Sequence, residues 1–115
     1  MGDTLFGIQG AALELRSARM GMIASNIANA ATPGYKARDI DFAEAMRRSL
    51  AGESSQKAAD SAIRYRQPVM PSLDGNTVGL PNEQIAFSQN AVGYAATLSF
   101  IRGRVETVTR ALRGD

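Results

Sequence analysis

The chain has 115 residues, a natural length for one domain, and 44% of them are hydrophobic, although three Tyr, four Phe and no Trp provide little material for a large core. It contains no Cys and no His, which excludes disulfides and thiolate chemistry and removes the commonest general base and transition-metal ligands. Its 13 basic and 11 acidic side chains leave a net charge of only +2, which does not favour a nucleic-acid-binding protein.

Residues 3–31 have the pattern of a helix. Apolar residues recur at alternating three- and four-residue steps, with Arg19 at the one stripe position that is not apolar. These apolar residues are Leu5, Ile8, Ala12, Leu15 and Met22. The same steps then reach Asn26 and Asn29, so amides replace apolar side chains at the end of the stripe. The first residues lack a basic segment followed by an apolar run, so we expect no cleaved secretory signal. The sequence also has no apolar run of about 18 residues, so we expect no membrane-spanning helix.

The next segment, residues 32–80, is predicted to be a connecting arm. It begins with Pro33 and Gly34, which predict a type II turn. Pro suits the second position of such a turn, and Gly supplies the positive φ that its third position needs. The chain is therefore expected to change direction directly after the first helix.

Within the arm, Asp41 and Glu44 form an Asp-x-x-Glu capping box, which predicts a short helix over residues 42–50. The polar, small residues 53–62 predict a flexible linker. Residues 63–80 contain several Pro and Gly residues between β-favouring ones, which predicts an extended segment that can form a loose hairpin.

The strongest predicted element is a helix over residues 81–112. Its apolar residues keep a heptad pattern for more than three heptads. These seam residues are Phe87, Ala91, Tyr94, Leu98, Ile101, Val105, Val108 and Leu112. At about 1.5 Å per residue, about 30 helical residues span about 45 Å, so this helix needs a long partner.

The predicted fold is mainly α, with long N- and C-terminal helices paired as an antiparallel coiled coil. Residues 1–31 and 81–115 form this inner core. Apolar residues lie off the predicted seam, among them Ile27, Val92 and Phe100, and two helices leave each other's outer faces uncovered. We therefore expect association with other chains to supply part of the stability.

Two stretches of the sequence resemble a known family. The first is SNIANAATPGYKARDIDFAEAM, which is similar to the N-terminal signature of the axial proteins of the bacterial flagellum, that is, the rod, hook and hook-associated proteins. Its TPGYKARDIDF part is most similar to proximal rod proteins. The second is DGNTV, which is followed by Glu83 and a long helix. The resemblance covers residues 5–50 and 74–115, and Ala31 and Gly79 depart from it where family members often have an acidic residue.

The resemblance implies a structural subunit of the flagellar basal-body rod that polymerises helically into the proximal part of a hollow drive shaft. It implies partners as well: copies of the chain, other rod proteins such as FlgC and FlgF, the adaptor FliE, and through it the MS ring of the inner membrane. It also implies export by the flagellar type III apparatus, without a cleaved signal, to the rod in the periplasmic space.

We expect Asn26 and Asn29 to fix the register between packed helices, because amides bond to neighbouring backbones where apolar contacts would let helices slide. The alternative, that they only cap the helix end before Pro33, stays open. The residues predicted at subunit interfaces are Asn26, Ile27, Asn29, Phe87, Tyr94, Leu98, Ile101, Val105, Val108 and Leu112. The predicted turn and arm contacts are Pro33, Gly34, Tyr35, Arg38, Asp39, Asp41 and Phe42.

Two other classes of function fit parts of the sequence. Asp39, Asp41 and Glu44 form an acidic cluster that could perform acid–base chemistry or hold Mg²⁺. Helix capping explains the cluster better and no catalytic motif accompanies it, so no enzyme, metal or cofactor is expected. A helical adaptor outside the flagellum, or a nucleic-acid binder, is suggested by arginines near the C-terminus that also suit the helix dipole. They are Arg102, Arg104, Arg110 and Arg113.

Overall fold

The computed structural model describes residues 6–68 and 70–114. The elements follow the order α1 (Gly7–Ala28), β1 (Arg38–Ile40), α2 (Phe42–Leu50), α3 (Ser55–Ser61), β2 (Ile63–Tyr65) and α4 (Leu80–Arg113). The described molecule is elongated, with principal extents of 65 × 26 × 16 Å. The predicted mainly α fold with long terminal helices is confirmed.

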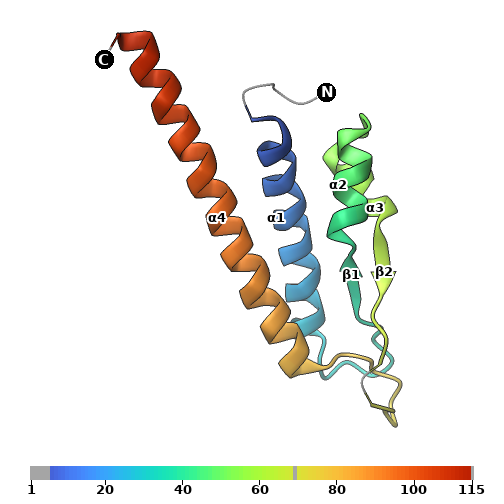
Figure 1. Cartoon of the computed structure of the whole chain (residues 1–115). Coiled ribbons are helices and arrows are strands. Elements are labelled where there is room, and N and C mark those ends of the chain that lie inside the picture. The colour runs from blue at the N-terminus through green and yellow to red at the C-terminus, as the bar shows by residue number, and fades with distance from the viewer. Residues whose placement is uncertain (1–5, 69, 115) are drawn as a thin grey trace.

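The two terminal helices lie side by side and run in opposite directions (Figure 1). α1 has 22 residues and α4 has 34, so α4 is longer by roughly 18 Å at 1.5 Å per residue. The helices are close together where α4 begins and separate toward its C-terminus (Figure 1). The C-terminal part of α4 therefore extends past the N-terminal end of α1.

The arm folds back along α1, on the side away from α4 (Figure 1). β1 pairs with β2 in antiparallel fashion, with Ile40 opposite Ile63. α2 occupies the predicted residues, and the carboxylate of its N-cap, Asp41, accepts a hydrogen bond from the Glu44 amide at 3.1 Å. α1 is thus the middle layer, between α4 and the arm.

Two sequence predictions for the arm are wrong. The expected flexible linker over residues 53–62 contains α3, which begins after an N-cap at Ser54 and buries Ala58 and Ala59, and its C-cap Ala62 is buried as well. Alanine adds little to a hydrophobic pattern, yet its small side chain lets a helix pack closely and become buried. The expected hairpin within residues 63–80 is also absent from the described residues, because β2 pairs instead with β1.

The apolar core lies between α1 and the arm. Its buried members are Leu15, Ile40, Ala45, Ala58, Ala59 and Ala62, with Met22, Phe42, Met46 and Ile63 packed against them. The buried residues of α4 are all polar: Glu83, Asn90 and Thr97, at seven-residue intervals. The fully buried part of α4 is therefore polar, whereas the core between α1 and the arm is apolar.

This polar contact corrects the predicted heptad seam. The seam residues Ala91, Leu98, Val105 and Leu112 are not fully buried, and their place beside α1 is taken by the polar heptad that begins at Glu83. The hydrophobic pattern missed this register because burial of polar side chains depends on partners in other elements, which a pattern of apolar residues does not record.

Leu15 tests the position of the core, because its side chain is fully buried between α1 and the arm. We expect Leu15→Ala to lower the free energy of unfolding by about 2–5 kcal/mol, through lost burial and the cavity left behind. Chemical denaturation followed by circular dichroism measures this. The control is Leu50→Ala on α2, where the side chain is 59% exposed and little change is expected. Equal effects of the two variants would contradict the placement of the core.

Candidate register-setting network and assembly surface

Asn26, near the end of α1, joins three elements through one side chain. It has no exposed surface. Its amide nitrogen donates to the carbonyl oxygen of Arg38 at 2.6 Å and to Oε1 of Glu83 at 3.0 Å. Its amide oxygen accepts from the backbone nitrogen of Arg38 at 3.1 Å. Asn26 therefore holds β1 and α4 in register on α1, within a single chain.

Glu83 is the second fully buried polar group at this point of the fold. Its Oε2 accepts a hydrogen bond from Arg66 at 2.6 Å, and Arg66 also pairs with Asp39 at 3.1 Å. Asp39 in turn accepts two hydrogen bonds from Arg19, at 2.9 and 3.0 Å. We call these residues, together with Asn26, the polar network.

The polar network balances its charges. It contains two guanidinium groups, Arg19 and Arg66, and two carboxylates, Asp39 and Glu83. An arginine guanidinium is always protonated at physiological pH, and the hydrogen bond with Asp39 raises the pKa of Arg19 further. A buried charge is costly unless it is paired and hydrogen bonded, so loss of one member leaves another uncompensated. The network can therefore fix one arrangement of α1, the arm and α4.

Asn29 has a different role from Asn26. It is the C-cap residue of α1, and its amide nitrogen donates to the Ser25 carbonyl oxygen at 2.8 Å. The backbone carbonyl oxygens of Asn29 and Thr32 accept hydrogen bonds from Asn76, at 3.0 and 2.8 Å. This arrangement favours the alternative in which Asn29 caps the helix, and it ties the turn to the loop before α4.

The predicted turn residues Pro33 and Gly34 are exposed, and Gly34 has the positive φ, 76°, that the turn requires. The Gly34 amide donates to the Asp74 carbonyl oxygen at 2.8 Å. Hydrogen bonds from Ser72 and from the Asn76 amide lower the pKa of Asp74. Tyr35 is half-buried, and its hydroxyl lies 3.1 Å from that of Ser25.

A second polar contact lies further along the two helices. The side chain of Asn90 donates to the backbone carbonyl oxygen of Arg16 at 2.8 Å. The Arg16 guanidinium lies over the ring of Phe42, 4.2 Å from its centroid, a cation–π contact with the arm. A side chain at Gly93 would meet the Arg16 guanidinium at 2.6 Å, so glycine leaves the space that this guanidinium occupies.

The predicted acidic cluster is divided between different roles, since Asp39 belongs to the polar network while Asp41 and Glu44 serve α2. Asp41 caps α2, and Glu44 pairs with Arg47 and Arg48 at 2.7 and 2.8 Å. The hydrogen bond from Arg47 lowers the pKa of Glu44. Within residues 6–68 and 70–114, no group of three or more His, Cys, Asp or Glu side chains could hold a metal ion.

The remaining predicted interface residues, most of them on α4, are half-buried or exposed. Phe87, Tyr94, Leu98, Ile101 and Val108 are half-buried, as is Ile27 on α1. Val105 is 40% exposed and Leu112 is 83% exposed. Other apolar side chains are exposed on α4 off this seam, such as Val92 at 71% and Phe100 at 55%. α4 thus presents apolar surface to solvent along its length.

Sequence reasoning did not identify Arg19, Arg66, Asn76, Glu83 or Asn90 as site residues. One usable signal was present for two of them, since Glu83 and Asn90 begin the polar heptad of α4. Arg19 interrupts the apolar stripe of α1, which also marks a position where a charge must find a partner. Nothing in the local sequence identifies Arg66, because its partners lie in β1 and α4.

The polar network gives a direct test through Glu83. We expect Glu83→Ala to lower the free energy of unfolding by roughly 3–5 kcal/mol, because Arg66 and Asn26 lose a buried partner. Denaturation in urea, followed by circular dichroism, gives the change. Glu106→Ala is the matched control, since it removes an exposed carboxylate from the same helix and should have little effect. A Glu83→Ala protein as stable as the control would show that the network does not hold α4 on α1.

Among the described residues, no helix is both long enough and apolar enough to cross a membrane. A family model described as "Flagella basal body rod protein" matches residues 7–36, which include all of α1 and the turn after it. Flagellar basal body rod protein FlgB of Cereibacter sphaeroides is 42% identical over 120 residues, covering 95% of this chain and 94% of the relative.

Further relatives carry the same name. FlgB of Aeromonas hydrophila is 38% identical over 126 residues, covering 98% of this chain and 96% of the relative. FlgB of Escherichia coli strain K12 is 36% identical over 130 residues, covering 96% and 94%. These alignments span the arm as well as both terminal helices. The chain belongs to the family of the flagellar basal body rod protein FlgB.

Proposed function

We propose that this chain is a structural subunit of the flagellar basal body rod whose α4 completes its packing against neighbouring subunits. Membership of the FlgB family supports the structural role. The observation that supports the packing is the apolar surface of α4, which continues past the N-terminal end of α1. On this surface Leu112 is 83% exposed. Contiguous apolar surface on a helix indicates a protein-interaction site.

The energetic argument follows from this surface. We call residues 101–113 of α4 the overhang. Its seam side chains are Ile101, Val105, Val108 and Leu112. Fully burying a Val or Leu side chain contributes about 1.5–3 kcal/mol, so even partial burial of this seam against a neighbour favours association. A contact of this kind between different surfaces does not need to close into a ring, and it can generate an open helical filament.

The polar network helps to fix the direction in which α4 extends toward neighbouring subunits. It fixes the start of α4 against α1 and the arm through Asn26, Glu83 and Arg66. A helix held firmly at one end presents its other end in a defined direction, which a repeating assembly requires. The turn residues Pro33, Gly34 and Lys36 are exposed beside the network and are available to neighbours on that side.

The partners and location follow from the family. Assembly with other basal body rod components is implied by family membership. The finer proposal is that these components are copies of the chain, FlgC, FlgF and the adaptor FliE, with the MS ring beyond them. We also propose that the chain is exported by the type III apparatus to the periplasmic part of the rod. The resemblance of its sequence to axial proteins supports both parts.

Incorporation into basal bodies tests the function. Cells that lack the chain should fail to swim, and a tagged copy should restore swimming and purify with basal bodies. We expect Val108→Glu to reduce the incorporated amount several-fold, because it places a charge in the overhang seam, and Thr107→Glu, on an exposed neighbouring position, to change it little. Circular dichroism of both purified variants checks that each is folded. Absence of the wild-type chain from basal bodies would overturn the proposed function.

A further inference from the structure

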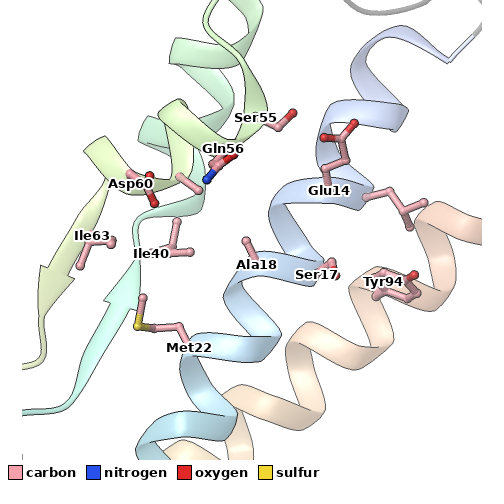
Figure 2. Close-up of a pocket in the computed structure, with 12 residues that line it drawn as sticks. Glu14, Ser17, Ala18, Met22, Ile40, Ser55, Gln56, Asp60, Ile63 and Tyr94 are labelled. Atoms are coloured by element: carbon pink, nitrogen blue, oxygen red, sulfur yellow. The ribbon is translucent and has the colours of Figure 1, made fainter.

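A groove of about 600 Å³ runs along α1 on the face between the arm and α4. The side chains that line it come from three sides, and Figure 2 shows them around the groove. Its apolar part includes Ala18, Met22, Ile40, Ala59, Ile63 and Tyr94. Ala18 on α1 and Ala59 on α3 are small, so a side chain from another helix can approach the backbone of α1 closely at Ala18.

The groove has an acidic rim. Glu14 of α1 and Asp60 of α3 line it, and both side chains are exposed. Neither carboxylate has a hydrogen-bonding or ion-pair partner among residues 6–68 and 70–114. The groove therefore combines an apolar floor with negative charge on the side of α1 and on the side of α3, and it suits an apolar segment flanked by cations.

The overhang of α4 has this chemistry. Its seam is apolar, and the geometry of a helix with 3.6 residues per turn places Arg102 and Arg104 on opposite flanks of that seam. Its 13 residues span about 20 Å, and the groove follows α1 from Leu13 to Met22, about 14 Å. The overhang is longer than this stretch of α1, and the two surfaces are complementary in apolar character and in the sign of their charges.

The overhang cannot enter the groove of its own chain. Asn26 contacts Glu83, and Arg16 contacts Asn90, so α4 passes the groove with the residues around Tyr94. Val108 lies 18 residues beyond Asn90, about 27 Å further along the helix. Only the overhang of another molecule can fill the groove in this way.

We propose, building on the function above, that the overhang of one copy docks into the groove of a second copy, antiparallel to α1 of that copy. This orientation repeats the packing of α4 on α1 within the chain. The contact joins two different surfaces, so each copy that offers an overhang also offers a free groove to the next. Such a head-to-tail contact propagates without closing, as a rod subunit requires.

Disulfide cross-linking tests this contact, and the chain has no native Cys to interfere. A disulfide requires Cα atoms about 4.4–6.8 Å apart, so it reports direct contact. The variant Ala18→Cys/Val108→Cys should give disulfide-linked dimers and higher oligomers in purified basal bodies. Leu13→Cys/Leu112→Cys should do the same. Leu13 lies about one helical turn before Ala18 and Leu112 about one turn after Val108, and antiparallel packing brings such positions together.

Two matched controls and one charge variant sharpen the test. The first control, Leu13→Cys/Val105→Cys, combines positions that antiparallel packing keeps apart along the helices. The second, Ala18→Cys/Thr107→Cys, places one thiol off the seam. Both should give several-fold less oligomer. Asp60→Lys, added to the first variant, should reduce its cross-linking several-fold by placing positive charge opposite the arginine flanks.

The outcomes separate this inference from the proposed function. If the chain is present in basal bodies but neither Ala18→Cys/Val108→Cys nor Leu13→Cys/Leu112→Cys cross-links, the docking is wrong while the rod function stands. Cross-links from these positions to a different protein would also overturn it, because the occupant would not be a second copy. Absence of the wild-type chain from basal bodies would instead contradict the proposed function itself.

Discussion

The arrangement of this protein depends on the buried contact between Asn26 and Glu83. The two residues lie 57 positions apart in sequence, and their hydrogen bond joins the end of α1 to the start of α4. Arg66 and Asp39 extend the contact to the arm, so three parts of the chain meet in one charge-balanced network. Because unpaired buried charges are costly, alternative registers of these elements are disfavoured. This network and the second polar contact, between Asn90 and Arg16, together set the direction of α4 and thus of its overhang.

The two faces of α1 hold their neighbours by different physical means. The face toward the arm is apolar and includes Leu15 and Met22, whereas the face toward α4 buries Asn90 and Glu83. A polar contact specifies register well but contributes less to stability than apolar burial of the same size. α4 therefore lies against α1 from Glu83 to Thr97, where its buried residues are polar, and its last turns extend past the N-terminal end of α1. We propose that apolar burial against neighbouring subunits completes its packing.

Parts of this structure could be predicted from the sequence because they depend on local patterns. Heptad spacing gave α4, and the Asp41 capping box gave α2. α3 was missed because its alanines resemble a flexible linker until their contacts with α1 are known. The polar network was missed for the same reason, since the partners of Arg66 and Glu83 come from distant parts of the chain. Asn26 was singled out as a residue that sets register, and its hydrogen bonds join α1 to β1 and α4 within one chain, whereas its role at a subunit interface stays a prediction.

The most direct test of this account is hydrogen exchange along α4. In dilute purified protein, amides of residues 102–113 should exchange much faster than those of residues 86–97, because the polar contacts with α1 hold only the first part of the helix. In basal bodies, the same overhang amides should become strongly protected. Slow exchange of residues 102–113 in dilute protein, unchanged by concentration, would contradict the claim that α4 completes its packing on other subunits.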